Sequence, residues 1–267
     1  PKSPRVRRIA ALARKKDRLL AGRFLVEGPQ AVRELLVHRP DLAETVYATT
    51  GTDPWQHEVD RLADAGGIPI ERVTDQVLAA MGETVHPQGV LAVARMESVS
   101  LSDVLAGAAL VAIMHEVRDP GNAGTVLRAA DAAGADAVVF AGQSIDPWHP
   151  KVVRSTTGSL FHIPVATAAT LDEAVAGARA AGLTVLAADV RGDELTSATA
   201  QLKGPVAWVF GNEARGLTSS ERELADRSLR LPIYGKAESL NLATAASVCL
   251  YTTAFAQREQ RSTSAPS

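Results

Sequence analysis

Short apolar runs alternate with stretches of helical periodicity along the second half of the chain. The expected strands are residues 109–114, 137–140, 184–188, 206–210 and 228–231. The expected helices are residues 123–133, 150–157, 172–181, 219–225 and about 239–257. Strands that alternate with helices predict a mostly parallel α/β sheet covered by helices on both faces.

The first half carries a shorter version of the same pattern. Its expected elements are an apolar run at 24–26 before the helical stretch GPQAVRELLVHR, strands at 45–48, 68–73 and 90–94, and a helix at 54–65 capped by Asp53 or Thr52. Residues 96–106 are small and polar with no clear period, so we expect a domain boundary there. The chain would then hold a smaller amino-terminal α/β domain over residues 1–100 and a second domain over residues 106–260.

Three loops that follow expected strands combine glycine with polar side chains. The first leads through the turn DPGN into a helix, where Asn122 could form the cap and Arg128 lies in the second turn. Neither a Walker loop nor a G-x-G-x-x-G fingerprint occurs in the chain, so a dinucleotide site of the usual kind is not expected.

The second loop is GNEARGL, at 211–217, and the third is LPIYGKAESLNLA, at 231–243. Ser239 would be a natural helix cap, whereas Asn241 would lie inside the helix, where Asn is a weak former. Each loop alone could be an ordinary solvated joint or a capped core helix. Because the carboxyl ends of parallel strands meet at one edge of a sheet, three such loops together predict a shared ligand site.

Charge is distributed unevenly along the chain. The net charge is −2, but residues 1–23 hold nine Lys or Arg and a single acidic residue, Asp17. A basic arm on an acidic body favours a polyanionic partner, most simply nucleic acid, over a solubilising tail.

Other features exclude several classes of protein. Hydrophobic residues make up 46% of the chain, which is typical of a folded globular protein, and no apolar run is long enough to span a membrane. The single cysteine, Cys249, excludes an internal disulfide and favours a reducing compartment. The six histidines show no ligand spacing. We therefore expect a cytoplasmic protein that binds no metal and no membrane.

The three loops, in their order and spacing, resemble the motifs of the SpoU (TrmH-like) family of RNA ribose 2′-O-methyltransferases, in the SPOUT superfamily. The matching motifs are Asn122-x-Gly124-x-x-x-Arg128, Gly211-Asn212-Glu213-x-x-Gly216-Leu217, and residues 233–243 with Ser239 and Asn241. Residues 24–36, FLVEGPQAVRELL, also resemble the family's substrate-binding domain. The resemblance implies a SPOUT-type sheet with a deep trefoil knot near its carboxyl end, a homodimer, and S-adenosylmethionine as cofactor.

The resemblance also implies roles for individual residues. The catalytic set would be Arg128, Asn122, Glu213, Ser239 and Asn241. The cofactor would contact Gly211, Asn212, Glu213, Leu231, Ile233, Leu240 and Leu242. RNA would contact Arg5, Arg7, Arg8, Arg14, Lys15, Lys16 and Arg128.

Arg128 has the central chemical role in this hypothesis. Because a guanidinium is protonated at ordinary pH, we expect Arg128 to bind the phosphate next to the target ribose and to stabilise the alkoxide, not to act as a base. Glu213 would fix either Arg128 or the knot loop. Asn122, Ser239 and Asn241 would hold the substrate and the loops in place.

The substrate expected from the separate amino-terminal domain and its basic arm is 23S ribosomal RNA, methylated on a ribose 2′-oxygen. Some family members of this kind confer resistance to a ribosome-targeting antibiotic, as in the avilamycin and thiostrepton types. The alternatives are a transfer-RNA 2′-O-methyltransferase, a SPOUT enzyme that methylates a base, and a non-enzymatic RNA-binding protein on the same fold.

Overall fold

The structure is a computed structural model that describes residues 3–84 and 86–264. The chain divides into two compact units, an amino-terminal unit (Pro1–Ser98 with Asp146–His162) and a carboxy-terminal unit (Val99–Ile145 with Ile163–Ser267). From the sequence, residues 146–162 were expected to belong to the second domain, residues 106–260. In the structure, Val153 and Phe161 of this segment pack into the core of the amino-terminal unit, which explains its assignment there.

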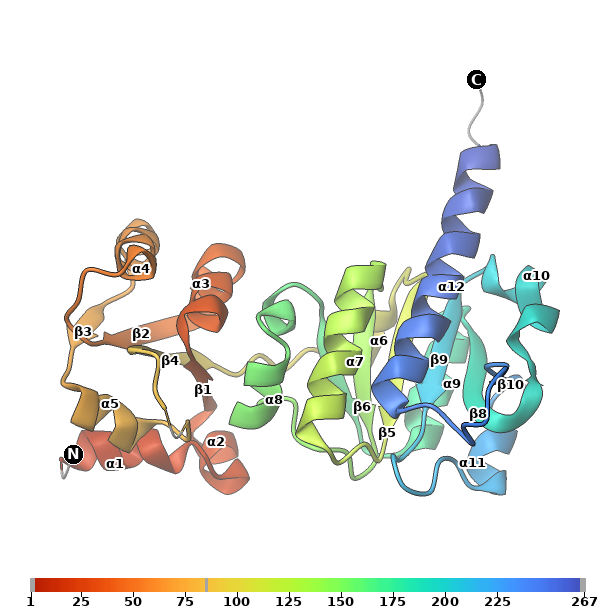
Figure 1. The fold of residues 1–267 in the computed structure, drawn as a ribbon, viewed down its shortest axis with the longest axis horizontal. Coiled ribbons are helices and arrows are strands. Elements are labelled where there is room, and N and C mark those ends of the chain that lie inside the picture. The colour runs from red at the N-terminus through yellow and green to blue at the C-terminus, as the bar shows by residue number, and fades with distance from the viewer. Residues whose placement is uncertain (1–2, 85, 265–267) are drawn as a thin grey trace. The chain divides into compact units, whose positions relative to one another are not determined.

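The amino-terminal unit is built on a mixed four-stranded sheet (Figure 1). In sheet order, its strands are β1 (Arg23–Glu27), β4 (Val90–Arg95), β2 (Ala43–Ala48) and β3 (Ile70–Arg72). Strand β4 runs antiparallel to both β1 and β2, and β3 runs parallel to β2. Its helices are α1 (Pro4–Ala11), α2 (Lys15–Ala21), α3 (Pro29–His38), α4 (Pro54–Ala65), α5 (Asp75–Met81) and α8 (Pro150–Ser155), with short 3-10 turns η1 (Pro40–Leu42) and η2 (Ser159–Phe161).

The two faces of this sheet carry separate apolar clusters. On one face, Val32 and Leu35 of α3 and Val59 of α4 pack on the strands. On the other face, α1 and α5 cover the sheet through apolar residues that include Val6, Ile9, Leu78 and Met81. The helix expected at residues 54–65 is confirmed, and Asp53 forms a capping box at its start.

The basic stretch at the amino terminus is folded into helices, not an extended arm. Ser3 caps α1 by accepting a hydrogen bond from the Val6 amide at 3.2 Å. Arg18 of α2 is fully buried and donates to Asp146 at 2.7 Å and to the carbonyl of Leu12 at 2.9 Å. Part of the positive charge counted in this region is therefore structural.

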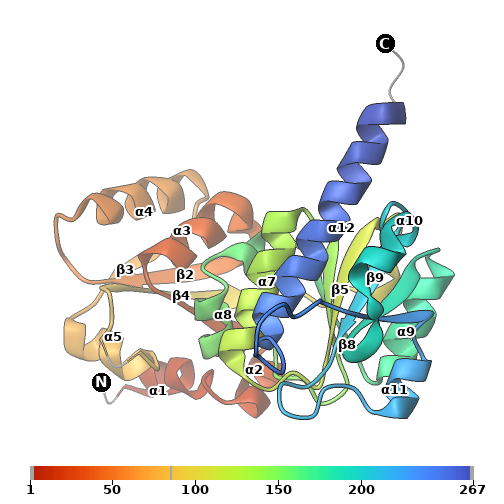
Figure 2. The same cartoon turned by 45° about the vertical axis from the view of Figure 1, so that its right-hand side comes forward.

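The carboxy-terminal unit is built on a six-stranded parallel sheet (Figures 1 and 2). In sheet order, its strands are β10 (Arg227–Arg230), β8 (Thr184–Glu194), β9 (Val206–Phe210), β5 (Leu110–His115), β6 (Ala137–Ala141) and β7 (Val165–Ala168). The expected parallel α/β sheet is confirmed. Strand β8 continues six residues beyond the expected end at Ala188, and β7 was not expected.

Helices cover both faces of the parallel sheet. Helices α6 (Leu101–Leu105) and α9 (Leu171–Ala180) pack on one face through an apolar cluster with strands β5, β6, β8 and β9. Helices α7 (Pro120–Ala133) and α12 (Leu242–Ser264) lie side by side on the other, as both views show (Figures 1 and 2). Two shorter helices are α10 (Thr199–Leu202) and α11 (Ser219–Glu223), and η3 (Leu195–Ala198) follows β8. Trp208 is fully buried and donates to the Thr253 hydroxyl of α12, as expected of a core residue.

Two expected helix caps are wrong. Asp119 caps α7 by accepting from the Asn122 amide at 2.7 Å, so Asn122 lies within the first turn. Helix α12 begins at Leu242, so Ser239 lies three residues before the helix and cannot be its cap. The Asn241 side-chain oxygen accepts from the amides of Ala243 and Thr244, at 2.9 and 3.3 Å. Asn241 is therefore the cap, a position that Asn favours, and not a weak residue inside the helix.

Among the described residues, no helix combines the length and the apolar character that crossing a membrane requires.

Candidate active site

A cavity of about 350 Å³ lies at the carboxyl ends of strands β8, β9 and β10, a size within the range of small-molecule sites. Three segments of the chain line it: the end of β8, the turn after β9, and the chain from β10 to the start of α12. All seven residues expected to contact a cofactor are among its lining residues, namely Gly211, Asn212, Glu213, Leu231, Ile233, Leu240 and Leu242. Ser239 also lines the cavity, and Phe210 contributes to its apolar wall.

The turn after β9 is tight because glycine occupies position 211. A β-carbon there would lie 2.7 Å from the backbone carbon of Gly216, far inside van der Waals contact. The Asn212 carbonyl accepts from the Gly216 amide at 2.9 Å, and the Asn212 side chain accepts from the amides of Ala214 and Arg215. The turn therefore presents a fixed backbone surface to the cavity.

Glu213 joins this turn to the loop between β5 and α7. Its carboxylate accepts from the amides of Arg118, at 3.2 Å, and Asp119, at 3.0 Å. The Asn212 side-chain amide strengthens the link by donating to the Glu116 carbonyl at 2.8 Å. Glu213 was expected to fix either Arg128 or the knot loop, and its bonds to the Arg118 and Asp119 amides fix the loop. Within residues 3–84 and 86–264, Arg128 is not among the hydrogen-bond partners of the Glu213 carboxylate.

The third loop is joined to the first through two asparagines. The Asn241 side chain donates to the Asn122 side-chain oxygen at 3.0 Å while its own oxygen caps α12. The first loop is thus connected by hydrogen bonds, at one edge of the sheet, to two loops that lie more than 80 residues further along the chain. Arg128 is exposed on α7, the helix that begins at this junction.

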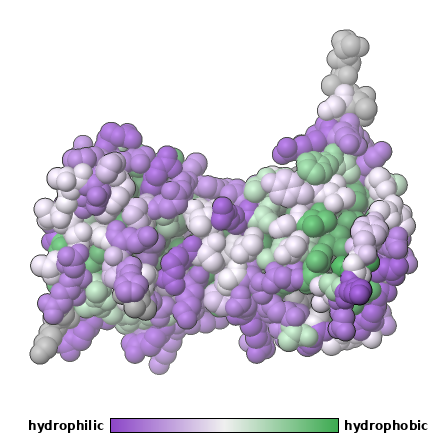
Figure 3. Space-filling view, viewed as in Figure 1, coloured by the Kyte–Doolittle hydropathy of each residue, from purple (hydrophilic) through white to green (hydrophobic). Residues whose placement is uncertain are grey.

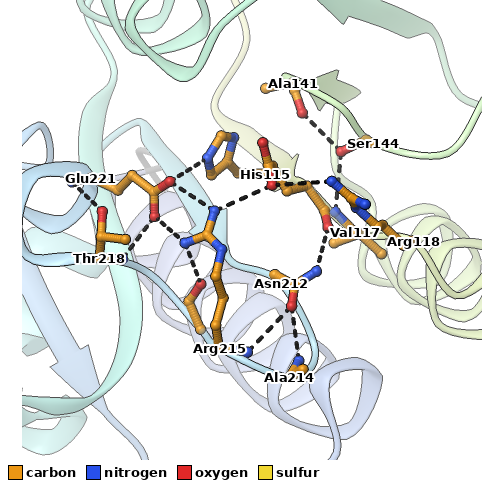
Figure 4. A network of polar contacts seen from close by, with 12 residues as sticks. His115, Val117, Arg118, Ala141, Ser144, Asn212, Ala214, Arg215, Thr218 and Glu221 are labelled. Atoms are coloured by element: carbon orange, nitrogen blue, oxygen red, sulfur yellow. Dashed lines mark hydrogen bonds and ion pairs between the residues drawn. The ribbon is translucent and has the colours of Figure 1, made fainter.

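Behind the β9 turn, charged groups form a network that the sequence did not suggest (Figure 4). The Arg215 guanidinium donates to Glu221 at 2.7 and 2.9 Å and to Glu116 at 3.3 Å. Glu221 also accepts from the Thr218 amide and from the His115 ring. These hydrogen bonds, above all those from Arg215, hold the pKa of the Glu221 carboxyl far below its usual range. A network of hydrogen bonds and ion pairs therefore braces the turn that lines the cavity.

Two residues on β8, Asp189 and Arg191, also line the cavity, although their sequence pattern was not expected to mark a site. Asp189 is almost completely buried, and Arg191 donates to its two oxygens at 2.8 Å each. Burial acts to raise the pKa of Asp189, but the hydrogen bonds from Arg191 outweigh it and lower that pKa. The signal was present in the sequence, since the charged stretch ADVRGD follows an apolar strand as in the other loops.

The residues expected to bind RNA at the amino terminus belong to the other unit. Arg7, Arg8, Arg14, Lys15 and Lys16 are all exposed, on α1, on α2 or at its cap. Arg5 donates to the Tyr47 hydroxyl at 2.8 Å and forms an ion pair with Glu71, so part of its charge is already matched within the unit.

The fold and the cavity together define a class of protein. It is an α/β protein with a small-molecule site, lined by both apolar and polar groups, at the carboxyl ends of parallel strands. Comparison with known proteins narrows this class. The model of the SpoU rRNA Methylase family matches residues 109–251, and a model described as RNA 2′-O ribose methyltransferase substrate binding matches residues 25–99.

Individual relatives match over most of the chain. A 23S rRNA (guanosine(2553)-2′-O)-methyltransferase of Bacillus subtilis is 34% identical, over 94% of this chain and 96% of the relative. A 23S rRNA (uridine(2479)-2′-O)-methyltransferase of Streptomyces viridochromogenes is 31% identical, over 91% and 86%. The structure of the SpoU methyltransferase AviRb of that organism, in complex with AdoMet, superposes with a TM-score of 0.82 at 28% identity, over 97% of this chain and all of AviRb.

This chain belongs to the SpoU rRNA methylase family, and it is an S-adenosylmethionine-dependent RNA methyltransferase. The cavity fits that cofactor by its own chemistry. Leu231, Ile233, Leu240 and Leu242 offer an apolar surface for adenine, and the Gly211 turn offers backbone groups for polar edges. S-adenosylmethionine carries no phosphate, which agrees with the lack of a phosphate-binding glycine fingerprint in the sequence.

Proposed function

We propose that this protein methylates the 2′-hydroxyl of a ribose in 23S ribosomal RNA. The observation that carries the proposal is the cavity at the ends of β8, β9 and β10, together with the Asn241–Asn122 hydrogen bond that joins it to the start of α7. The choice of substrate is supported by the Bacillus and Streptomyces relatives, which are both named as 2′-O-methyltransferases of 23S rRNA.

When bound, the cofactor supplies a sulfonium methyl group for attack by the ribose oxygen. We propose that the chain's own contribution is to exclude water, fix the two reactants and stabilise charge. Arg128 is assigned the phosphate beside the target ribose and the alkoxide that develops. Asn122 and Asn241 hold the loops in register, Ser239, which lines the cavity, is assigned to holding the substrate, and Glu213 keeps the β9 turn against the β5–α7 loop.

We also propose that the chain between β10 and α12 forms the trefoil knot of SPOUT proteins and that the active enzyme is a homodimer. The first proposal is supported by the path of the chain, which leaves the sheet edge at β10 and returns across the cavity so that α12 packs beside α7. The second is supported by apolar side chains that α12 leaves exposed: Val248, Tyr251 and Phe255, which is 60% exposed. Apolar surface is visible over this part of the carboxy-terminal unit in Figure 3.

The exposed cations of α1 and α2 are assigned to RNA phosphates. Arg8, Lys15 and Lys16 are exposed on the amino-terminal unit, just before residues 25–99, which match the substrate-binding family model. Because each cation placed on a phosphate releases counterions, this surface would raise affinity without selecting a sequence. A ribosomal RNA substrate would place the enzyme in the cytoplasm. Whether the modification protects the ribosome from an antibiotic remains a prediction.

Methyl transfer from radiolabelled S-adenosylmethionine tests the proposal. Unmodified 23S rRNA, 16S rRNA and bulk transfer RNA are offered separately, and the product is hydrolysed in alkali. We expect label in 23S rRNA, recovered as an alkali-resistant dinucleotide, because a 2′-O-methyl group blocks cleavage of the adjacent phosphodiester. Label in transfer RNA alone would overturn the substrate, and alkali-labile label would indicate base methylation.

Calorimetry of S-adenosylmethionine binding distinguishes an enzyme from a non-enzymatic RNA-binding protein on the same fold. A chain that binds S-adenosylmethionine but labels neither naked RNA nor assembled ribosomal particles would contradict the enzymatic role in favour of a non-enzymatic RNA-binding protein. A Gly211→Val variant serves as the control for cofactor dependence, because its side chain would collide with the Gly216 backbone and deform the cavity.

A further inference from the structure

Two histidines and a glutamate meet in the amino-terminal unit, and none of them lines the cavity described above. Glu34 and His38 lie one turn apart on α3, and His162 directly follows η2. The Glu34 Oε2 atom lies 2.9 Å from His162 Nε2 and 3.2 Å from His38 Nε2. Each residue offers one ligand atom, and the three atoms lie within 4.8 Å of one another.

The carboxylate is held so that one oxygen faces the two rings. Glu34 is buried, and its other oxygen, Oε1, accepts from Gln30 at 2.9 Å and from Arg33 at 2.6 Å. Arg33 also donates to Glu58, so its positive charge is shared between two carboxylates. Oxygen Oε2 is left to the histidines.

The segment that carries His162 is pressed against Glu34. A β-carbon on Gly158 would lie 2.2 Å from Glu34 Cγ, and Gly158 has a φ of +107°, which other residues rarely adopt. The two imidazole rings themselves are in contact, with centroids 4.3 Å apart and an edge-on arrangement. The position of His162 is therefore set by backbone packing as well as by its hydrogen bond.

The spacing of the three atoms matches that of ligands around a tetrahedral metal. With zinc–ligand bonds of about 2.0–2.2 Å, neighbouring ligand atoms lie about 3.3–3.5 Å apart. The gaps of 2.9 and 3.2 Å would need to widen by only a few tenths of an ångström. The His38 side chain is 45% exposed, so water could complete the coordination. In both rings the Nε2 atom lies beside the same oxygen, Oε2 of Glu34. Ion pairing alone does not require this arrangement, whereas a shared metal ion does.

We propose that Glu34, His38 and His162 form a site for a divalent transition metal, with Zn²⁺ as the preferred ion. Two imidazoles and a carboxylate are a common donor set for zinc and suit it better than Mg²⁺ or Ca²⁺, which prefer oxygen ligands. The metal joins α3 to the 158–162 segment, so its role is to stabilise the amino-terminal unit. This role is independent of methyl transfer.

The test uses the full chain, freed of metal with a chelator and then titrated with ZnCl₂ in a calorimeter. We expect one Zn²⁺ per chain and a rise in Tm on saturation, since a ligand that binds only the folded state stabilises it. The His38→Gln and His162→Gln variants should each bind Zn²⁺ at least about tenfold more weakly. The matched control is His57→Gln, which removes an exposed histidine on α4 of the same unit and should leave binding unchanged.

X-ray absorption at the zinc edge supplies a second readout. A first shell of nitrogen and oxygen with imidazole scattering is expected, and a sulfur shell would instead implicate Cys249. Zinc affinity that is equal in the wild type and both histidine variants, or absent from the folded wild type, would overturn the proposal. Far-ultraviolet circular dichroism confirms that each variant is folded, and His38→Asn replaces any His38 variant that is not.

Discussion

The two units use the same kinds of element to different ends. The carboxy-terminal sheet is parallel throughout, so the loops after β5, β8, β9 and β10 emerge at one edge. The loops after β5, β9 and β10 connect to one another through Glu213, Asn122 and Asn241, and the segments at β8, β9 and β10 line a cavity. The amino-terminal sheet is mixed, and β4 runs against both of its neighbours. Its strand ends are divided between two edges, and its charged groups form surface ion pairs such as Arg39 with Asp41 and Glu97.

The direction of the strands therefore suits the two units to different tasks: the parallel sheet to a chemical site and the mixed sheet to a binding surface. A parallel sheet gathers polar loops that are distant in sequence, which suits a reaction that needs several groups within a few ångströms. A mixed sheet covered by basic helices offers a broad charged face, which suits a polyanion recognised along its backbone. The following substitutions test this division.

The largest effect is expected from Arg18→Ala in the amino-terminal unit. Arg18 and Asp146 are both buried, and truncating one partner leaves an unpaired buried charge, which costs about 3–5 kcal/mol. Hydrogen exchange of the β1 and β4 amides should speed up accordingly, while that of β5 and β9 changes little. Arg14→Ala, which removes an exposed pair with Asp17, is the control and should cost less than about 1 kcal/mol. Equal effects in both variants would contradict a structural role for Arg18.

Arg128→Ala should abolish most of the chemistry while leaving the cofactor site intact. We expect turnover to fall by about 10²–10³-fold, the usual cost of losing a donor to a developing oxyanion, with a cofactor Kd within about twofold of wild type. Arg179→Ala, on α9 at the opposite face of the sheet, serves as the control. If Arg128→Lys turned over at the wild-type rate, the planar fork of donors would not be the feature that matters.

Reversing three exposed charges should weaken RNA binding without slowing the chemical step. The variant combines Arg8→Glu, Lys15→Glu and Lys16→Glu. We expect its KM for RNA to rise about tenfold and its kcat to stay within about twofold of wild type. The slope of log K against log salt concentration should fall by about one unit for each phosphate contact removed. Lys203→Glu, in the other unit, is the control. An unchanged salt slope would show that α1 and α2 do not contact phosphates.

The smallest effect is expected from Glu221→Gln, which weakens the network behind the β9 turn. The pKa of Glu221 is lowered in the fold, so its contribution to stability is present above the pKa of about 4.3 that a glutamate has when unfolded, and is lost as pH falls below it. We expect a Tm about 2–4 °C below wild type at pH 7, a difference that shrinks below about pH 4. Glu223→Gln, an exposed neighbour on α11, is the control, and a pH-independent difference would contradict the ionic explanation.

The sequence predicted most of the elements that have a strong period or a cap. Residues 54–65 and 206–210 form a helix and a strand at the expected positions because helical spacing and β-branched runs are local signals. Helix α5, helix α6 and strand β7 were missed, since they are short and are stabilised by packing on their sheets instead of by their own pattern. The cap of α7 lies three residues before the expected Asn122, and the cap of α12 lies two residues after the expected Ser239, which is the usual weakness of boundaries read from sequence.

By itself the sequence determined the parallel sheet, the three polar loops at its carboxyl edge, and the family they belong to, because these follow from local periodicity and from motifs within a few residues. Only the tertiary structure decided which loops hold one another and that Asn241 caps α12 while reaching Asn122. It also decided that Arg18 is buried and that His162 meets Glu34, 128 residues away. These contacts depend on how sheets and loops pack, and that packing carries no signature in the spacing of residues along the chain.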